Sequence, residues 1–460
     1  MPLWTSEEIV RATGGTASAP FEMSGVTFDS REVGPGDLFI AMPGTVFDGH
    51  KFVDSAFAAG AAGVVVSQPV DGPHVLVGDP VAALEALGRA SRERSRATIF
   101  GVTGSVGKTS TKEALFAALE RNRPGKVHRS VKSYNNHTGV PLSLARMPRD
   151  AEFAVLEMGM NNAGEIRALV AQVRPHVALI TAIAPAHIEN LGSEEAIADA
   201  KAEIFQGLEP NGIAIVPNDT PHRDRLVKAA RRRADRIITF GGGDADVHAI
   251  HAVVAEGGGS LISASLLERE LTFTISQRGE HWVSNSLAVL AAIEAVGADV
   301  ALAGLALADL GGLKGRGERH VIEFDDGKVL LIDESYNANP ASMAATLQSL
   351  GAERDVARRI AVLGPMRELG EHSESLHAGL APAVRRASVD RLILIGPEMG
   401  SLADALGGTI EIARADSVDG AIDMLLSTLR AGDAVLVKAS NSVGLARLVE
   451  RVVKGQPCST

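Results

Sequence analysis

Short apolar runs separated by Gly- and Pro-rich turns occupy the chain between residues 23 and 88. A helix-like stretch, KFVDSAFAAGAA, follows the second run. Runs of this length between turn residues are typical of strands, so the pattern predicts a small mixed α/β domain. The strand-like runs are VTF at 26–28, LFIAM at 38–42, VVV at 64–66 and VLV at 75–77.

A longer alternation of strand-like and helix-like segments begins at Ala97. The apolar runs ATIFGVT, FAVLEM and VALITAI are each followed by a segment with helical character, expected from about Thr109, near GEIRALVAQV and through 194–208. Such alternation predicts a parallel sheet with crossover helices. Between about 247 and 277, paired apolar runs around a GGG turn instead predict an antiparallel annex.

The last part of the chain returns to the alternating pattern. The segment GGLKGRGERH at 311–320 is rich in Gly and charge, which is typical of a linker. Beyond it, the strand-like runs VLLIDE, RIAVLG, RLILIG, TIEIA and DAVLVKA alternate with helical stretches. We therefore predict a second, Rossmann-like doubly wound domain and place the three α/β domains at 1–88, 89–312 and 313–460.

The composition agrees with this division. The chain has 460 residues, about three times the ~150-residue size of a typical domain. Apolar residues make up 45% and aromatic residues only 4%, so the cores must consist mainly of aliphatic side chains, as in α/β proteins. Cys458 is the only cysteine, which leaves no disulfide framework or thiolate metal cluster to expect.

Charge and terminal sequence restrict the partners. The chain has 45 Lys and Arg against 56 Asp and Glu, and this net charge of -11 argues against a general nucleic-acid surface. Local N–H groups and one or two cations can still bind phosphorylated small molecules. The N-terminus lacks the pattern of a signal peptide, and no apolar run is long enough for a bilayer. We expect a cytoplasmic protein without membrane insertion.

The segment GVTGSVGKTST at 101–111 lies between the strand-like ATIF and the helical KEALFAALE. Its glycines allow close backbone approach to phosphate, Lys108 supplies a cation, and a hydroxyl of Thr109 or Ser110 can coordinate Mg²⁺. Val102 stands where the usual spacing has the first glycine. The alternative is a plain Gly-rich turn, but this setting favours ATP or GTP binding. The residues expected at the nucleotide are Gly104, Ser105, Val106, Gly107, Lys108, Thr109 and Ser110.

Two polar side chains follow the ends of the next two strands, where open α/β sheets bind ligands. Glu157 ends the apolar run FAVLE and is placed to hold a hard cation near the phosphate loop; a helix-capping or solvated glutamate is the alternative. His187 follows VALITAI, but a lone histidine is more often structural than a metal ligand.

Lys201 lies inside the helical segment AIADAKAEIF, with Glu203 close behind it. The simple interpretation is an exposed helical ion pair. If Lys201 instead points into the active cleft, its protonated amine cannot bind Mg²⁺. Reaction with CO₂ would convert this cation into a carbamate, which is an anionic oxygen ligand.

Several segments together, in their order and spacing, resemble those of the Mur ligase family over nearly the whole chain. They are FDSREVGPGDLFIAMPG with FDGHKFVDSAFAAGA, GVTGSVGKTST, YNNHTGVPLSL, EMGMNNAGEI, AHIENLGS with AKAEIF, GEHWVSNSLAVLAAI and DESYNANPASM. Within the family, DGH, YNNHTGVP and SYNANP are similar to the members that add D-alanyl-D-alanine.

This resemblance implies an ATP- and Mg²⁺-dependent ligase that joins D-alanyl-D-alanine to UDP-N-acetylmuramoyl-tripeptide through an acyl phosphate, in peptidoglycan precursor biosynthesis. It implies that residues 1–88 bind the UDP substrate, 89–312 bind ATP and 313–460 bind the incoming amine. The partners would then be small molecules and not nucleic acid, and we expect a monomer.

The resemblance also implies roles for single residues. The candidate substrate contacts are Ser30, Arg31, Asn135, Asn136 and His137. The candidate catalytic residues are Lys108, His187 and Lys201, and the candidate Mg²⁺ ligands are Thr109, Glu157, His187 and Lys201 as a carbamate. Asn285 matches an adenine contact and Arg316 a phosphate contact. The positions near the ribose and phosphates are Asp333, Glu334, Tyr336 and Asn337.

Three positions depart from the family pattern, and all of them lie in the third domain. Glu334 replaces an aspartate, Pro365 stands where aspartate is common, and Asn441 stands where arginine is often found. The alternatives are a sister ligase that adds a single amino acid, a ligase that extends folate with glutamate, and a nucleotide-dependent switch or binding module. The pattern of the first domain argues against the folate ligase.

Overall fold

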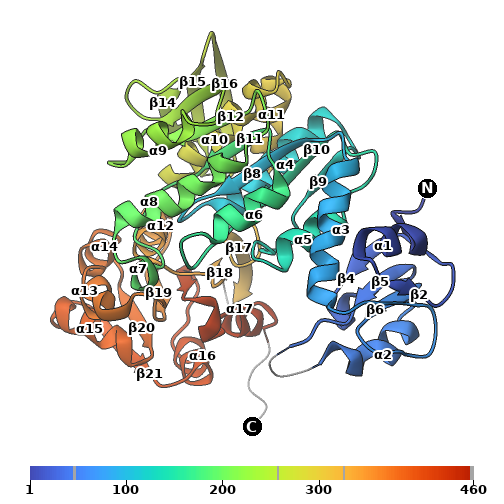
Figure 1. Cartoon of the computed structure of the whole chain (residues 1–460). Coiled ribbons are helices and arrows are strands. Elements are labelled where there is room, and N and C mark those ends of the chain that lie inside the picture. The colour runs from blue at the N-terminus through green and yellow to red at the C-terminus, as the bar shows by residue number, and fades with distance from the viewer. Residues whose placement is uncertain (45–47, 256–257, 325–326, 456–460) are drawn as a thin grey trace.

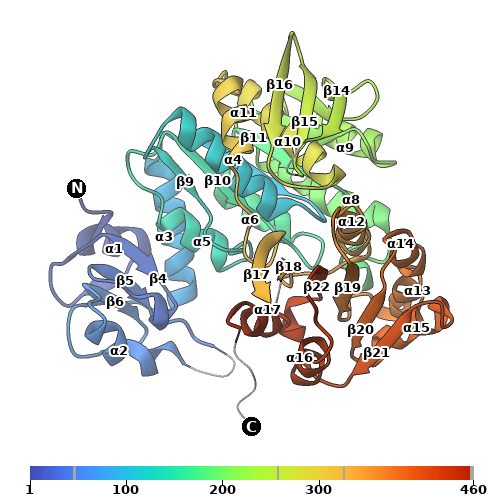
Figure 2. The same ribbon diagram turned by 180° about the vertical axis from the view of Figure 1, so that it is seen from behind.

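The computed structural model describes residues 1–44, 48–255, 258–324 and 327–455, and Cys458 lies outside these ranges. The chain forms three α/β lobes, and the central lobe contacts both of the others (Figure 1). Seen from behind, the N-terminal and C-terminal lobes lie on the two sides below the central lobe (Figure 2). Among the described residues, no helix is both long and apolar enough to cross a membrane.

The N-terminal lobe is the small mixed domain that the sequence predicts. Its main sheet contains β2 (Thr16–Ala17), β4 (Gly25–Thr27), β5 (Asp37–Ile40), β6 (Gly63–Val66) and β7 (His74–Leu76). These strands lie in the order β2-β7-β6-β5-β4, and all pairs are parallel except β2 with β7. The other elements are β1 (Trp4–Thr5), α1 (Ser6–Thr13), β3 (Glu22–Met23), η1 (Ser30–Glu32), η2 (Gly49–Phe52) and α2 (Val53–Ala58).

Helix α3 (Pro80–Arg94) joins this lobe to the central one. Asp79 caps its first turn and Pro80 occupies the first helical position, where a missing N–H costs nothing. At its other end, the buried Arg92 donates hydrogen bonds to the carbonyl oxygens of Val173 and Arg174 in the central lobe. The helix is continuous through residue 88. The predicted boundary between the first and second domains therefore lies within a helix that packs on both lobes.

The central lobe is built on one nine-stranded sheet with the order β16-β15-β14-β13-β12-β11-β8-β10-β9. The strands from β9 to β14 pair in parallel, and β14, β15 and β16 are antiparallel. The predicted annex is therefore present, and it extends the parallel sheet. The bounds are β8 (Thr98–Thr103), β9 (Val127–Arg129), β10 (Phe153–Glu157), β11 (Val177–Ile180), β12 (Ile213–Pro217), β13 (Arg236–Gly241), β14 (Val247–Val254), β15 (Ser260–Leu266) and β16 (Arg269–Ile275).

Helices cover both faces of this sheet, and each face has its own apolar core. One face is covered by α4 (Lys108–Asn122), α10 (Glu280–Ala295) and α11 (Val300–Ala308). The other is covered by α5 (Gly139–Ala145), α6 (Glu165–Val173), α8 (Glu194–Ala202) and α9 (Arg223–Ala230). The short α7 (Ile188–Leu191) and η3 (Glu203–Gly207) flank α8.

The C-terminal lobe is a six-stranded sheet in the order β17-β18-β22-β19-β20-β21, with helices on both faces. All strand pairs are parallel except β17 with β18. Its strands are β17 (Glu318–Phe324), β18 (Gly327–Glu334), β19 (Arg358–Leu363), β20 (Arg391–Ile395), β21 (Glu411–Ala415) and β22 (Asp433–Lys438). Its helices are α12 (Pro340–Gly351), η4 (Gly370–His372), α13 (Ser373–Ala378), α14 (Ala381–Arg386), η5 (Pro397–Met399), α15 (Gly400–Leu406), α16 (Val418–Leu426), η6 (Asn441–Val443) and α17 (Ala446–Val453).

The segment 311–320, which was expected to be a linker, is one only in part. Its last three residues begin β17, which pairs along its whole length with β18. Charged side chains are common on edge strands, where they discourage pairing with other chains. The same charges concealed this strand in the sequence. The predicted three-domain α/β architecture is otherwise confirmed.

Candidate active site

A cavity of about 450 Å³ lies where the central and C-terminal lobes meet, and it collects most of the side chains singled out in the sequence. The central lobe contributes Ser105, Val106, Gly107, Lys108, Ser110, Ser133, Asn135, Glu157, Gly159, Met160, Asn161, His187, His281, Trp282 and Asn285. The linker and C-terminal lobe contribute Gly315, Arg316, Glu334, Tyr336, Asn337, Asn339, Ala341, Ser342, Ala345, Thr346 and Lys438.

The loop between β8 and α4 has the geometry of a phosphate-binding turn. Gly107 caps α4 with φ 82°, and Gly104 has φ 151°, so both use backbone conformations that favour glycine. A Cβ atom on Gly104 would lie 1.9 Å from Oγ1 of Thr181. Val102, the departure from the usual spacing, is a fully buried residue of β8. It therefore belongs to the sheet core and not to the turn that faces the cavity.

Lys108 lies over this loop at the start of α4. Its Nζ donates to the carbonyl oxygen of Gly104 at 2.7 Å. Burial lowers the pKa of Lys108, while the nearby Glu157 opposes this shift. The amine is therefore held where phosphate oxygens at the helix N-terminus would meet it.

Glu157 is a buried carboxylate with defined partners, which excludes the solvated alternative. It is 0% exposed, accepts from Thr109 Oγ1 at 2.9 Å and accepts from Asn135 Nδ2 at 2.7 Å. A carboxylate beside a hydroxyl offers the hard oxygen donors that Mg²⁺ prefers. These two side chains fit a magnesium ion next to the phosphate loop.

Lys112 is a buried residue that supports the site from behind Glu157, and the sequence analysis missed it. It is fully buried, and its Nζ donates to the carbonyl oxygens of Ser130 and Lys132 at 2.9 and 2.7 Å. The same Nζ lies 3.9 Å from Glu157 Oε2. Lys112 thus joins α4 to the segment that carries Asn135. A lysine one turn into an amphipathic helix looks solvent-exposed in the sequence, and the GKTSTK run is the only hint of its role.

His187 reaches the cavity from the turn before α7. It has φ 60°, which is uncommon for a residue other than glycine. Its ring nitrogen Nδ1 is hydrogen-bonded to Glu368 of the C-terminal lobe. His187 therefore lines the cavity and also binds the C-terminal lobe.

Lys201 is not the exposed ion-pair partner of Glu203, so the simple interpretation of the sequence is wrong. Lys201 is 1% exposed, whereas Glu203 accepts hydrogen bonds from the backbone N–H groups of Gly164 and Arg167 and from the Arg167 side chain. Burial, with a contribution from the charge of Lys108, lowers the pKa of Lys201 well below its usual value. Lys201 is not among the described residues that line the cavity.

The linker and C-terminal lobe bring cations and an aromatic ring to the opposite wall. The guanidinium of Arg316 lies 4.3 Å from the ring centre of Tyr336, and its Nη2 lies 3.4 Å from Ser133 Oγ. Asn285 is buried in α10 beside Gly107. Arg316 and Asn285 both line the cavity that contains the phosphate loop.

Lys438, a second residue missed in the sequence, pairs with Glu334 inside this wall. Its Nζ donates to the carbonyl oxygen of Asn337 at 2.9 Å and lies 3.4 Å from Glu334 Oε2. Burial lowers the pKa of Lys438 and raises the pKa of Glu334, and their mutual attraction opposes both shifts. The pair places a buried cation near the cavity. Lys438 ends a strongly apolar strand, so only its position at the strand end could have suggested a role.

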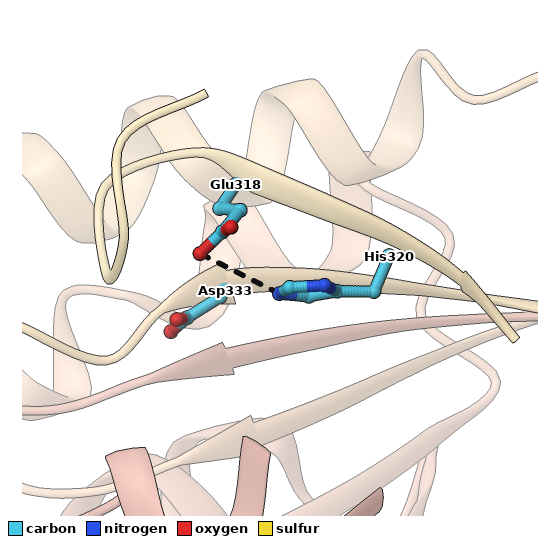
Figure 3. Close-up of side chains that lie close together, drawn as sticks. All are labelled: Glu318, His320 and Asp333. Atoms are coloured by element: carbon cyan, nitrogen blue, oxygen red, sulfur yellow. Dashed lines mark ion pairs between the residues drawn. The ribbon is translucent and has the colours of Figure 1, made fainter. Parts of the chain in front are cut away.

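Asp333 has a different position from its neighbour Glu334. It is 1% exposed, and its two carboxylate oxygens accept from the backbone N–H groups of Gly315 and Ser335 at 3.0 Å each. It also lies near Glu318 and His320 of β17, with His320 Nε2 3.6 Å from Glu318 (Figure 3). Because its oxygens already bind the backbone, we interpret Asp333 as bracing the turn that carries Arg316.

The other expected substrate contacts lie outside this cavity. Ser30 and Arg31 form part of η1 in the N-terminal lobe, where Arg31 pairs with Asp29. The side chain of Asn136 accepts from Gly139 N–H at 2.9 Å at the start of α5, and His137 is exposed. Of the five expected substrate contacts, only Asn135 lines the cavity.

Comparison with known proteins identifies the family. The descriptions that match are "Mur ligase family, catalytic domain" at residues 22–97, "Mur ligase middle domain" at 102–293 and "Mur ligase, glutamate ligase domain" at 315–441. A UDP-N-acetylmuramoyl-tripeptide–D-alanyl-D-alanine ligase from Synechocystis sp. is 36% identical over 451 residues, covering 96% of this chain and 94% of the relative.

The chain belongs to the Mur ligase family. Two solved Mur ligases have the same fold as this one. MurF from Acinetobacter baumannii is 29% identical with a TM-score of 0.84, and the match covers 99% of both chains. MurF ligase from Thermotoga maritima, solved in complex with ADP, is 29% identical with a TM-score of 0.77 and covers 94% of this Mur ligase and 97% of that chain.

Proposed function

We propose that this Mur ligase joins D-alanyl-D-alanine to UDP-N-acetylmuramoyl-tripeptide, with cleavage of ATP to ADP and phosphate, in peptidoglycan precursor biosynthesis. The observation that carries the proposal is that the phosphate loop, Glu157, Arg316 and Lys438 all line one and the same cavity. Such a site can bind a nucleoside triphosphate next to a second substrate that is anionic. The names of the full-length relatives supply the identity of the substrates.

Each lobe would hold one reactant. We assign the UDP end of the substrate to residues 1–88, ATP to 89–312 and the incoming dipeptide to 313–460, with α3 as the shared helix at the first boundary. Ser30 and Arg31 are then candidate contacts for the UDP end, outside the cavity that contains the phosphate loop. Closure of the lobes would exclude the water that otherwise hydrolyses an activated carboxylate.

In the first step, the terminal carboxylate of the tripeptide attacks the γ-phosphoryl group of ATP, the bond from Pγ to the bridging oxygen breaks, and ADP leaves as the acyl phosphate forms. Lys108 and Arg316 stabilise the charge that develops on the transferred group. The neutral amine of the dipeptide then attacks the acyl carbon, and phosphate leaves as the amide forms. Lys438 stands on the C-terminal wall, where it can stabilise the oxyanion of the tetrahedral intermediate.

Thr109, Glu157 and His187 would hold Mg²⁺, which supplies charge neutralisation at the phosphates when bound. We further propose that Lys201 is carbamylated. Its buried amine with a lowered pKa is neutral more often than an ordinary lysine, and only the neutral amine can attack CO₂. The N–C bond forms as a proton leaves, and the product is an anion that the nearby Lys108 stabilises.

Phosphate release tests this function. A ligase should release phosphate only when UDP-N-acetylmuramoyl-tripeptide and an amine are both present with ATP. A nucleotide-dependent switch would instead hydrolyse or bind ATP without regard to the carboxylate and the amine, and that result would refute the proposal. Cytoplasmic location and a monomeric state stay predictions, which cell fractionation and sedimentation can check.

A further inference from the structure

A hydrogen bond between His187 and Glu368 joins the central lobe to the C-terminal lobe beside the cavity. His187 precedes α7 of the central lobe, and Glu368 precedes η4 of the C-terminal lobe. Nδ1 of the imidazole is hydrogen-bonded to Oε2 of the glutamate. His187 lines the cavity with the phosphate loop, whereas Glu368 does not line it.

Backbone conformation indicates that both ends of this contact are held in place. His187 has φ 60° and Glu368 has φ 62°, so both are in the left-handed region that residues with a Cβ rarely adopt. Such conformations persist where the surrounding structure imposes them, and they cluster at functional sites. Two of them meeting across a lobe interface is a second observation, independent of the hydrogen bond.

Residues next to His187 and Glu368 also pack across the interface between the central and C-terminal lobes. The N–H of Glu189 donates to the carbonyl oxygen of Glu368 at 3.4 Å, and Ile188 packs against the core of the C-terminal lobe. At Gly370, a Cβ atom would lie 3.0 Å from Cγ of Glu189, so the backbones approach closely here. The turn that carries His187 is thus shaped by the C-terminal lobe.

The hydrogen bond to Glu368 influences which ring nitrogen of His187 carries the proton. A carboxylate beside Nδ1 favours the tautomer that carries its proton there, and this leaves a lone pair on Nε2. In the described part of the chain, Nε2 of His187 has no hydrogen-bond partner. It is therefore free to accept a ligand from the cavity.

We propose that Glu368 is a positioning residue that fixes the tautomer and orientation of His187, so that Nε2 is ready to bind the metal of the nucleotide complex. Because Glu368 belongs to the C-terminal lobe, His187 is set in this way only when the two lobes are in contact. Assembly of the metal site is thereby coupled to lobe closure. This inference rests on the proposed role of His187 as a metal ligand.

The test uses the full-length chain with the substitutions Glu368→Asn, Glu368→Gln and His187→Asn. Asparagine tolerates the left-handed conformation but is too short to reach the imidazole, whereas glutamine keeps the length and an acceptor oxygen. Glu371→Gln is the matched control, because Glu371 is an exposed carboxylate in η4 without a contact to His187. Circular dichroism checks that each variant is folded.

Two readouts separate positioning from a purely structural role. In ¹⁵N-histidine spectra, assigned by the signals lost in His187→Asn, the Nδ1–H tautomer should dominate in the wild type and mix with the other in Glu368→Asn. Titration with Mn²⁺ in the presence of ADP, followed by electron paramagnetic resonance, should show affinity reduced by about 10- to 100-fold in Glu368→Asn. Glu368→Gln should be intermediate, and Glu371→Gln should match the wild type.

Three outcomes would overturn the inference in distinguishable ways. If Glu368→Asn keeps the wild-type spectrum and Mn²⁺ affinity while His187→Asn loses affinity, Glu368 is not a positioning residue and the role of His187 stands. If His187→Asn itself binds Mn²⁺ like the wild type, the proposed metal role of His187 fails and the inference fails with it. A KM for the UDP-linked substrate that rises as much as metal affinity falls would indicate general damage and would also contradict it.

Discussion

Replacing Lys201 with methionine should stabilise the protein and abolish ligation together. Lys201 is 1% exposed, and no carboxylate in the described part of the chain forms an ion pair with it. Methionine has a similar length and flexibility but no amine. The substitution therefore removes the buried polar group while the surrounding packing is preserved.

The size of the effect follows from the burial. Burying a polar group without a hydrogen bond costs about 1–3 kcal/mol in protein mutational data. Lys201→Met should recover an amount of this order. For a domain of this size, about 1 kcal/mol corresponds to roughly 2–4 °C, so the unfolding transition of the central lobe should rise by roughly 2–12 °C.

The difference in stability between Lys201→Met and the wild type should also depend on pH. Because the pKa of Lys201 is lowered in the folded state, the unfolded chain binds more protons between that pKa and the ordinary lysine value. Wild-type stability should therefore rise with pH in this window, and the advantage of Lys201→Met should shrink. The cost of the lysine is largest below the folded-state pKa and is lost above the unfolded one.

Differential scanning calorimetry in CO₂-free buffer and in bicarbonate measures these effects. Bicarbonate should raise the transition of the wild type, because a carbamate would ion-pair with Lys108, and should leave Lys201→Met unchanged. Lys228→Met, a substitution at an exposed position of α9, is the control and should not stabilise. A Lys201→Met protein that is less stable than the wild type in CO₂-free buffer, or that still ligates, would refute the reasoning.

Three further substitutions test the remaining charges of the site. Lys108→Ala should keep the fold and lower kcat by roughly 10²- to 10³-fold or more, since nothing replaces its charge at the transferred phosphoryl group; loss of folding in circular dichroism would contradict this. Glu157→Gln should raise the Mg²⁺ concentration needed for half-maximal phosphate release by about tenfold or more, and an unchanged titration would remove Glu157 from the metal site. Lys438→Met should raise the pKa of Glu334 further, because the cation that opposes the effect of burial is gone; the acid limb of the kcat/KM profile should move to higher pH, and an unshifted limb would separate Glu334 from activity.

Much of the fold could be predicted from the sequence because strands and helices of α/β domains differ in their apolar periods. The loop at 101–111 and the strand-end Glu157 were recognisable for a related reason, since parallel sheets place ligands at the carboxyl ends of their strands. The edge strand β17 was missed because its charged residues resemble a linker. The boundary at 88 fell inside α3 because a helix shared by two lobes carries no local mark of where one lobe ends.

The site could be predicted less completely, because contacts between lobes leave no trace in local sequence. Nothing near Glu368 or Lys438 indicates that they approach His187 and Glu334. The role of Lys201 was ambiguous in the sequence. A helical lysine close to a glutamate fits an exposed ion pair as well as it fits a buried site residue. Only tertiary packing separates a buried lysine from a solvated one.

The most direct measurement of the central claim compares phosphate release from ATP with UDP-N-acetylmuramoyl-tripeptide and either D-alanyl-D-alanine or free D-alanine. A site built around a dipeptide leaves its polar groups unpaired when a single amino acid binds. We expect kcat/KM to be at least roughly 10²-fold higher with D-alanyl-D-alanine. Comparable rates with both amines, or a preference for the single amino acid, would contradict the assignment and indicate a sister ligase.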